Sequence, residues 1–471
     1  MKLVGILELA SKYRYGITSH GSPLYLFKPY DSAAPDYIVG SASRETVNQI
    51  AVIDACDSDK TTERQRANLS RIIGPVGNYD AEREALLLHY CPNKPVETLN
   101  GTPHDTAIPR ILNELADSHR TELSAATGWV TFHIDPAGCR DIDDAIAYNH
   151  ETRTWAITIA DAAAAVAAGS PTDLAANAIG ATFYDLEGRA LRTMLPATIS
   201  EDSASLLPGQ RRRGVTLFLE RLSTSANGSD SMTVGTTQAR FGLTWITVEH
   251  SFTYDSFRGS GVAFDLQVSK DPHAWIEELM IRYNREAAAV LKRETGFLRV
   301  QREATTDLPT SLRFLAMEAA TYEIVDDTPQ NHATLGGLYC HASSPLRRYA
   351  DLANQRVLRA VIIGHPSIIA LPLGILGGDF EGRLNDRAAA NRRWNRDLTF
   401  LTHVTPGRVH EVDVIWYSAD RVWVPLWRRL IRLRHEEARP VGAEGRIKIY
   451  CDPTRRNWKE RILTAPFLLS P

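Results

Sequence analysis

The chain has 471 residues, of which 44% are hydrophobic, 8% aromatic and 23% charged, with 53 Lys and Arg against 56 Asp and Glu. This length allows two to four domains, and this composition excludes a mainly disordered, collagen-like or disulfide-scaffold protein. No apolar run reaches the roughly 18 residues that a membrane span needs, and Glu8 and Lys12 interrupt the N-terminal apolar stretch. We therefore expect neither a membrane partner nor secretion.

The cysteines are few and scattered. Cys56, Cys91, Cys139, Cys340 and Cys451 form no CxxC pair and are odd in number. This pattern argues against a disulfide framework and a zinc ribbon, and it favours a reducing, cytoplasmic setting.

The N-terminal region begins as strands and continues as helices. Residues 1–58 hold short alternating runs between Gly, Ser, Pro and Asp turns, which predicts a small β-barrel. Over 59–104 the stretches TERQRANLSRII and DAEREALLLHY predict two helices, followed by a Pro-rich linker at 92–104. A winged-helix arrangement of this helical part is an alternative.

The remainder divides into a large mixed domain and a small barrel. Residues 105–402 mix strand-like and helix-like stretches, as expected of one α/β-type domain. Residues 403–471 contain short alternating runs that predict a five-stranded OB-type barrel. From Pro406 onward there are 13 Lys and Arg against 8 Asp and Glu, and the tryptophans are Trp416, Trp423, Trp427 and Trp458. The fold class is thus α+β multidomain.

A cluster of carboxylates lies in the segment HIDPAGCRDIDDA. It places Asp135, Asp141, Asp143 and Asp144 within ten residues. Such like charges either stay apart in solvent or surround a hard cation, because Mg2+ and Mn2+ prefer oxygen ligands. Apolar strand-like residues flank the loop on both sides, which favours the second interpretation, and the positions of Gly and Glu exclude an EF-hand.

A second constellation, YCHASSPLRRYADLANQR, follows about 200 residues later. Ser344 and Pro345 predict a helix start, which puts Arg347 and Arg348 in the first turn. The two arginines can form ion pairs with Asp351 at helical spacing, or they can clamp an anion, since guanidinium groups match phosphate oxygens.

Together the two motifs resemble the catalytic domain of the ribonuclease II and ribonuclease R (RNB) family of 3'-to-5' exoribonucleases. The resemblance covers about 105–471. It implies an RNB-type catalytic domain flanked by the N-terminal barrel-plus-helices region and the C-terminal OB-type barrel, acting as a monomer on single-stranded RNA with Mg2+ or Mn2+.

The resemblance also assigns roles to residues. It implies that Asp135, Asp141, Asp143 and Asp144 bind the metal and that Arg347 contacts the scissile phosphate. The implied RNA-binding residues are Tyr184 as a base-stacking residue, Tyr254 as a wedge that sets product length, Phe264 as a second stacking aromatic, and Arg348 beside the phosphate contact.

Two departures from the family pattern affect these expectations. Only about ten residues separate Tyr254 from Phe264, fewer than is usual in the family. The front end has room for one barrel plus helices, whereas family members usually carry two cold-shock barrels.

The residues favour hydrolytic cleavage of phosphodiesters. Clustered aspartates can hold two Mg2+ ions that generate hydroxide and stabilise the leaving 3' oxygen, while an arginine offsets charge on phosphorus. Combined with this chemistry, the resemblance implies a Mg2+-dependent 3'-to-5' exoribonuclease that releases nucleoside 5'-monophosphates. Alternatives are a catalytically silent RNA-binding protein with the same fold and a phosphatase acting on small phosphate esters.

Overall fold

The computed structural model describes residues 2–55, 65–95, 107–221, 237–266, 268, 270–303, 308–364, 379–403, 408–433, 439–452 and 458–466. The chain forms two compact units: unit 1 comprises Met1–Asn93, Ala304–Met317 and Ala389–Pro471, and unit 2 comprises Lys94–Glu303 and Glu318–Ala388. Unit 1 therefore collects its residues from three separate stretches of sequence.

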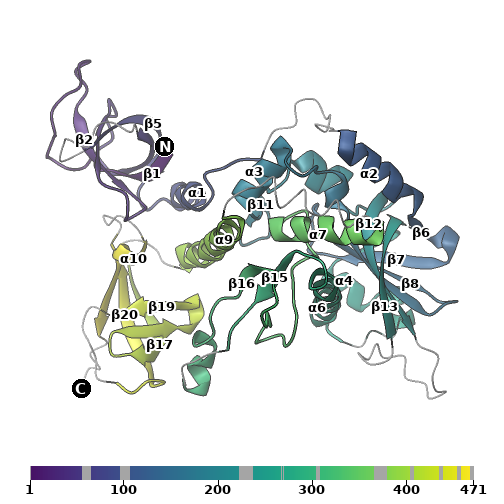
Figure 1. The fold of residues 1–471 in the computed structure, drawn as a ribbon. Coiled ribbons are helices and arrows are strands. Elements are labelled where there is room, and N and C mark those ends of the chain that lie inside the picture. The colour runs from purple at the N-terminus through teal and green to yellow at the C-terminus, as the bar shows by residue number, and fades with distance from the viewer. Residues whose placement is uncertain are drawn as a thin grey trace. The chain divides into compact units, whose positions relative to one another are not determined.

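Unit 1 begins with a closed five-stranded barrel in the order β1-β2-β3-β5-β4, near the N label of Figure 1. Its strands are β1 (Lys2–Leu7), β2 (Leu24–Pro29), β3 (Tyr37–Gly40), β4 (Gln49–Ala55) and β5 (Gln65–Pro75). Alternating side chains such as Leu7, Phe27 and Val39 fill the barrel, as period-two patterning predicts.

The expected pair of helices after the barrel is half wrong. The stretch read as the first helix forms β5, which joins β3 to β4 and so closes the barrel. The second stretch forms α1 (Tyr79–Tyr90), whose N-terminus is capped by the Asn78 side chain accepting from the Ala81 N–H. Because β5 is a barrel strand and α1 is the single helix described between 65 and 95, the winged-helix alternative is not observed there.

The C-terminal part of unit 1 is an antiparallel sheet in the order β19-β18-β17-β20-β21. Its elements are β17 (Val409–Ser418), β18 (Arg421–Val424), η7 (Pro425–Trp427), β19 (Arg429–Arg432), β20 (Glu444–Cys451), α10 (Trp458–Arg461) and β21 (Ile462–Pro466). No pairing between β19 and β21 closes it within the described strands, so it is a curled sheet where a closed barrel was expected. The short helix η5 (Thr310–Leu315) contributes Phe314, which packs edge-on against Trp423.

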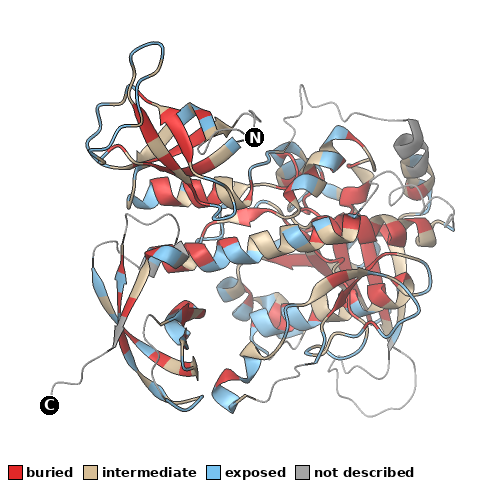
Figure 2. Ribbon diagram, turned by 60° about the vertical axis from the view of Figure 1, so that its left-hand side comes forward, coloured by how far each residue is buried: buried red, intermediate tan, exposed pale blue. Residues whose placement is uncertain are grey.

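Unit 2 is built on a seven-stranded sheet in the order β14-β7-β8-β9-β12-β13-β6, which is antiparallel except at β14-β7 and β13-β6. The strands are β6 (Thr121–Leu123), β7 (Trp129–Ile134), β8 (Asp144–Asn149), β9 (Thr154–Ala160), β12 (Arg211–Arg221), β13 (Thr237–Thr247) and β14 (His250–Phe252). β9 is buried along almost its whole length, as expected of a central strand, and Figure 2 shows the buried residues in red.

Helices and two small sheets complete unit 2. The helices are α2 (Ala107–Ser118), η2 (Ala125–Thr127), η3 (Ala162–Ala164), α3 (Pro171–Ile179), η4 (Ile199–Ser203), α4 (Tyr254–Arg258), α5 (Gly261–Asp265), α6 (Pro272–Leu291) and α7 (Tyr349–Ile362), and α9 (Phe380–His403) continues into unit 1. The small sheets pair β10 (Phe183–Tyr184) with β11 (Ala190–Arg192), and β15 (Phe297–Val300) with β16 (Thr321–Ile324). Apolar residues of α6, including Trp275, Leu279 and Tyr283, share one core with Phe132 and Ile134 of β7.

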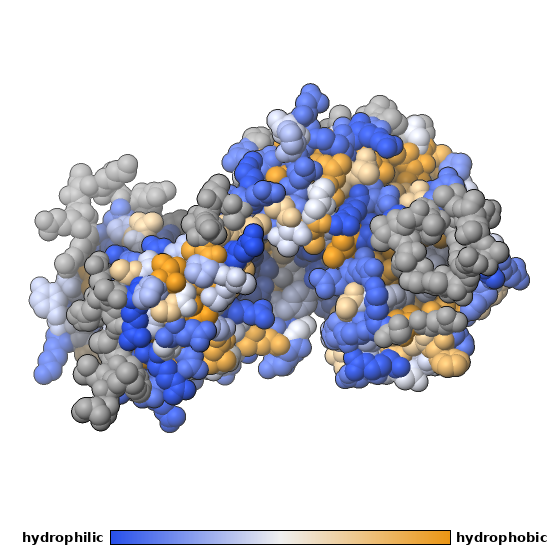
Figure 3. Space-filling model, turned by 90° about the horizontal axis from the view of Figure 1, so that it is seen from below, coloured by the Kyte–Doolittle hydropathy of each residue, from blue (hydrophilic) through white to orange (hydrophobic). Residues whose placement is uncertain are grey.

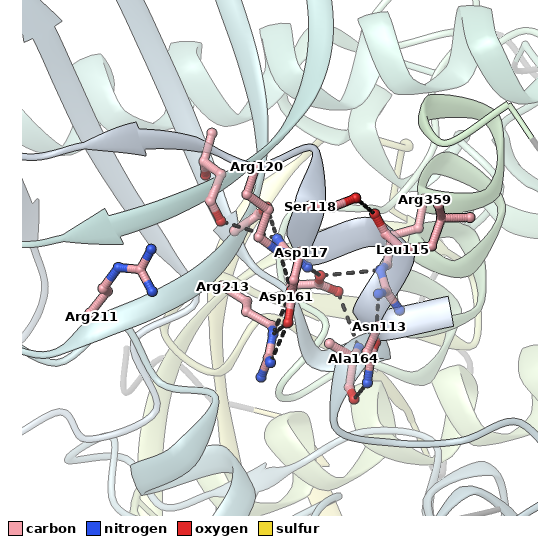
Figure 4. Close-up of polar contacts among 12 residues, drawn as sticks. Asn113, Leu115, Asp117, Ser118, Arg120, Asp161, Ala164, Arg211, Arg213 and Arg359 are labelled. Carbon is pink, nitrogen blue, oxygen red and sulfur yellow. Dashed lines mark hydrogen bonds and ion pairs between the residues drawn. The ribbon is translucent and has the colours of Figure 1, made fainter. Parts of the chain in front are cut away.

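A network of arginines and carboxylates ties α2 to the sheet and to α7 (Figure 4). Asp117 of α2 accepts from Arg120 at 2.7 Å and from Arg213 of β12 at 2.6 Å. Asp161, at the end of β9, forms ion pairs with Arg120 and with Arg359 of α7. The carboxylate of Asp161 is fully buried, so its charge is balanced inside the protein.

Two broader features bear on the sequence expectations. No helix among the described residues is long and apolar enough to cross a membrane, and the face drawn in Figure 3 mixes hydrophilic with separate hydrophobic areas. Cys91, Cys139, Cys340 and Cys451 are free thiols, and Cys56 lies outside the described residues.

Candidate active site

The four aspartates lie in the loop that joins β7 to β8 and at the first residue of β8. The Asp135 N–H donates to Phe252 O of β14, and the buried Ile142 donates its N–H to the Ser205 hydroxyl. A tight turn closes with Cys139 N–H on Pro136 O, and its third residue, Gly138, has φ +80°, a value that favours glycine. The loop is therefore held within the fold, as its apolar flanks indicated.

Asp143 joins the two sequence motifs. Its side chain is only 3% exposed, its Oδ1 accepts from Leu346 N–H at 2.9 Å, and its Oδ2 lies 2.9 Å from Arg347 Nε. Burial raises the pKa of Asp143 to about 7, an effect partly offset by Arg347 and by the Leu346 hydrogen bond. The motifs that are 200 residues apart in sequence thus meet at one carboxylate.

Asp144 lies close enough to Asp135 and to Asp143 to interact electrostatically with both. The pKa of Asp144 is raised well above its ordinary value by burial and by the charges of Asp135 and Asp143. Its carboxylate accepts no hydrogen bond from any described residue, whereas one oxygen of Asp135 lies 2.9 Å from His133 Nδ1. The site therefore concentrates negative charge that the described side chains balance only in part.

Asp141 is held by two neighbours. The Tyr184 hydroxyl donates to its Oδ2, and the Cys139 thiol donates to its Oδ1 at 3.5 Å. Burial and the charge of Asp141 raise the pKa of Tyr184, and burial with the nearby aspartates raises the pKa of Cys139. Tyr184, expected as a base-stacking residue, thus also contacts a candidate metal ligand through its hydroxyl.

The two remaining aromatic candidates differ in their surroundings. Tyr254 is the first residue of α4, and its ring stacks on His273 with centroids 3.6 Å apart. Its pKa is raised to about 12, by burial first and then by Asp135 and Asp144. Phe264 of α5 is 84% exposed, and no ring contact among the described residues joins it to Tyr254. The structure therefore brings Tyr254 to the aspartates, whereas Phe264 presents an exposed ring on α5.

The arginine motif corrects one expectation. Residues 345–347 form a turn in which the Arg347 and Arg348 N–H groups both donate to Ser344 O, and α7 begins at Tyr349. The helix thus starts four residues later than Ser344 and Pro345 predicted, because the backbone of Arg348 is extended (φ -134°, ψ 128°) and interrupts any helix that begins before it. Neither arginine lies in the first helical turn.

The two arginines are used differently. Arg348 donates to the fully buried Asp351 at 2.7 Å, which is the ion pair that the sequence allowed. The Arg347 side chain is 42% exposed while its partner Asp143 is buried. Arg347 therefore keeps donors that face outward.

Sequence reasoning missed His133 and Ser205, which support this loop. His133 stands two residues before Asp135, and residues at that spacing on an extended strand share a face. That spacing was a readable signal for the contact. Ser205 comes from a distant segment, accepting from Ile142 and donating to Arg140 O at 2.6 Å, and nothing local in the sequence points to it.

The donor chemistry of the site fits a hard divalent cation, whereas the side chains are not arranged as a completed ligand set. Carboxylate oxygens are the ligands that Mg2+ prefers, and the raised pKa values of Asp143 and Asp144 mean that a further positive charge would be stabilising. Among the described residues no group of three or more His, Cys, Asp or Glu side chains is positioned to hold a metal ion. Arg347 and Tyr184 occupy carboxylate oxygens of Asp143 and Asp141 instead.

Two of the C-terminal tryptophans are buried in the protein core. Trp416 and Trp427 are fully buried, so their rings are part of the core of unit 1 and are not available to stack on RNA bases. Several basic residues of this region are also paired, including Arg429 with Asp397 and Arg446 with Asp413. The local positive excess is therefore smaller at the surface than the sequence count suggested.

Comparisons with known proteins agree with the sequence resemblance. The family model described as RNB domain matches residues 120–259 and 303–364. Exoribonuclease 2 of Aeromonas hydrophila subsp. hydrophila is 26% identical over 335 residues, covering 52% of this chain and 49% of the relative. Probable exosome complex exonuclease RRP44 of Caenorhabditis elegans is 28% identical over 222 residues, covering 45% and 23%. The chain thus spans about half or less of these relatives.

Solved structures show the same fold over nearly the whole chain. The apo form of Mycoplasma genitalium RNase R has a TM-score of 0.69 at 15% identity, covering 99% of this chain and 90% of that one. Yeast Ssd1, a pseudonuclease, has a TM-score of 0.64 at 16% identity, covering 96% and 67%. The chain therefore carries an RNB domain within a mixed α/β multidomain fold, and its resemblance to the RNB family of ribonuclease II and ribonuclease R is confirmed.

Proposed function

We propose that this protein is a Mg2+-dependent hydrolytic 3'-to-5' exoribonuclease that degrades single-stranded RNA to nucleoside 5'-monophosphates. The observation that carries the proposal is the meeting of the two motifs at Asp143, where a buried carboxylate and a half-exposed arginine lie 2.9 Å apart. The family resemblance supplies the direction of degradation and the class of substrate, and the RNase R of Mycoplasma genitalium has been solved with single-stranded and double-stranded RNA.

Each candidate residue has a role in this proposal. Asp135, Asp141, Asp143 and Asp144 would hold Mg2+, which when bound activates water and stabilises the leaving 3' oxygen. Arg347 donates to the scissile phosphate as charge develops on it, since a guanidinium group matches phosphate oxygens. Arg348, through Asp351 and Ser344, fixes the turn that carries Arg347. In this proposal it would also lie beside the phosphate.

The aromatic residues would hold the RNA strand without reading its sequence. Tyr254 lies close enough to Asp135 and Asp144 to interact with their charges and would contact the terminal nucleotides, while the exposed Phe264 and the ring of Tyr184 offer further stacking surfaces. Stacking of a base on an aromatic ring contributes roughly 1 to 3 kcal/mol, which suits binding of any single-stranded sequence.

A catalytically silent RNA-binding protein is the second candidate. Two observations favour it: the fold is also that of the pseudonuclease Ssd1, and the ion pair of Arg347 with Asp143 occupies a candidate metal ligand. The presence of all four aspartates and of Arg347 favours the enzyme instead.

One experiment separates the two candidates. A 5'-labelled single-stranded RNA is incubated with the protein and Mg2+, with and without EDTA, and with the D143N variant as a control. A ladder that shortens from the 3' end, and that EDTA and D143N both abolish, supports the exoribonuclease. Retarded but uncut RNA under all conditions supports the silent RNA-binding protein.

A further inference from the structure

His133 has a position in β7 that directs its ring toward the candidate metal ligands. Phe132 and Ile134 point into the apolar core of unit 2, so His133 points to the opposite face, as alternation along a strand requires. Thr131 and Asp135 share that face with it. The His133 side chain is nevertheless 5% exposed, so the imidazole is enclosed by protein.

The polar contact of this buried ring goes to Asp135. His133 Nδ1 lies 2.9 Å from Asp135 Oδ2, and its Nε2 has no hydrogen-bond partner among the described residues. The strand pairing of β7 uses backbone groups and does not require an imidazole. A structural core histidine would more commonly have both nitrogens bound, because an unpartnered buried polar atom is costly.

The contact fixes one oxygen of Asp135 and leaves the other available. Asp143 and Asp141 each have both carboxylate oxygens engaged by other protein groups. By contrast, no described residue donates to Asp135 Oδ1 or to the carboxylate of Asp144. Asp135 is also held at its backbone, where its N–H donates to Phe252 O.

We propose that His133 is a positioning residue that orients Asp135 as a ligand for the divalent cation, so that His133 sets the affinity of the site for the metal. The inference rests on the proposed function. A hydrogen bond to a ligating carboxylate fixes its rotamer before the metal binds, and losing such a contact typically reduces metal affinity by about 10- to 100-fold. His133 acts through Asp135 and touches neither metal nor RNA.

The test compares three substitutions. H133F keeps a ring of similar size but removes the donor. H133N keeps an amide N–H near the position of Nδ1. T131V is the matched control, because Thr131 lies on the same face of β7, is fully buried, and donates to Thr247 O at 2.7 Å without contacting Asp135.

Metal affinity is measured on the RNA-free protein by titration with Mn2+ and detection of free Mn2+ by electron paramagnetic resonance. The Mg2+ concentration for half-maximal RNA cleavage provides a second readout. We expect H133F to raise the dissociation constant for Mn2+ and the half-maximal Mg2+ concentration, each by about 10- to 100-fold. Cleavage at saturating Mg2+ should change little, and H133N and T131V should stay near the wild type.

The outcomes are distinguishable. If the wild type binds Mn2+ and H133F binds it equally well, the role of His133 is overturned and the proposed function stands. Equal losses in H133F, H133N and T131V would also overturn it, because they indicate a general effect on β7. If the wild type does not bind Mn2+, both the metal dependence and this inference fail. Should H133F not fold, H133Q replaces it, since its amide reaches the position of Nε2 and not that of Nδ1.

Discussion

The two units each contain an arginine–carboxylate pair, and the pairs differ in how open they are. In unit 1, Arg461 Nη1 lies 2.8 Å from Glu82 Oε1, and both side chains are fully buried. In unit 2, Arg347 Nε lies 2.9 Å from Asp143 Oδ2, but the arginine is 42% exposed. Similar distances therefore occur in very different environments.

The surroundings of the two carboxylates explain the difference. Glu82 also accepts from the Tyr30 hydroxyl and from Gly77 N–H, so its charge is satisfied by groups that cannot leave. Burial and the charge of Glu82 raise the pKa of Tyr30 well above its ordinary value. One oxygen of Asp143 accepts from Leu346 N–H, but the other depends on the Arg347 side chain, which can turn toward solvent or toward a phosphate. We call Arg461–Glu82 the closed pair, which holds the fold together, and Arg347–Asp143 the open pair, which can exchange partners during a reaction.

The largest expected effect is on the open pair. D143N removes a ligand charge but keeps an oxygen that can accept from Leu346 N–H, so the protein should fold and bind RNA. We expect the cleavage rate to fall by at least about 1,000-fold. Single-turnover cleavage and RNA binding are measured in parallel. A variant that keeps more than about a tenth of the wild-type rate, equivalent to less than about 1.4 kcal/mol, would show that Asp143 is not a metal ligand.

Substitution in the closed pair should lower the stability of the protein and leave the rate of RNA cleavage unchanged. E82Q leaves Arg461 buried without its partner charge, which should lower the free energy of unfolding by about 3 to 5 kcal/mol. Chemical denaturation measures this loss. The matched control is E84Q, because Glu84 of the same helix pairs with Arg71 at the surface and should matter little. Slower cleavage of short RNA by folded E82Q would contradict a purely structural role.

R347A tests whether the open pair exchanges its partner. We expect single-turnover cleavage to fall by about 100- to 1,000-fold, since the donor acts on developing charge, while RNA affinity changes much less. Calorimetry should show a smaller loss of thermal stability than in E82Q, and Mg2+ should reduce that loss by replacing the positive charge beside Asp143. A fall in affinity with an unchanged single-turnover rate would make Arg347 a residue that only positions RNA.

Tyr254 tests the aromatic side of the open site. Y254A removes a stacking contribution of roughly 1 to 3 kcal/mol next to the aspartates, so the limit product should change in length while cleavage continues. F264A is the comparison, because Phe264 is exposed and lies on α5, the helix that follows α4. Denaturing gels of the end products measure both. If Y254A and the wild type give the same limit product at the same rate, Tyr254 only packs against His273 and does not contact RNA.

The smallest expected effect concerns surface arginines of unit 1. Arg421 and Arg428 are exposed and form no ion pair with a described residue, whereas Arg432 and Arg446 pair with Asp420 and Asp413. R421A/R428A should reduce the slope of log affinity against log salt by about 2, since each free cation displaces a counterion. The paired double variant R432A/R446A should reduce it less, and equal slopes in all three proteins would show that this sheet does not bind RNA.

The motifs made the centre of the site predictable, but not its internal contacts. The aspartates and Arg347 stand out by residue type and spacing, and the resemblance connected them. The bond from Tyr184 to Asp141 and the pairing of Arg347 with Asp143 join residues 43 and 204 positions apart. Side-chain rotamers and tertiary packing decide such contacts, and local patterns carry no information on them.

Strand β5 shows why part of the fold was missed. Its residues alternate weakly between buried and exposed positions, and their charged and apolar spacing also suits a helix. The parallel pairing with β3 and the antiparallel pairing with β4 stabilise the strand, so tertiary context overrides local propensity. The burial of Trp416 and Trp427 was also not predictable, because the composition identifies aromatic residues but tertiary packing decides which of them are buried.

The pairing of Glu82 with Arg461 has a consequence for the order of events during synthesis. The two residues are 379 positions apart, so a ribosome that adds about 5 to 20 residues per second completes Arg461 roughly 20 to 75 s after Glu82. Through that interval the nascent barrel and α1 carry a carboxylate whose counter-ion does not yet exist. Unit 1 therefore reaches its native state only after Arg461 has been translated, so the barrel that is made first waits for a counter-ion that is made hundreds of residues later.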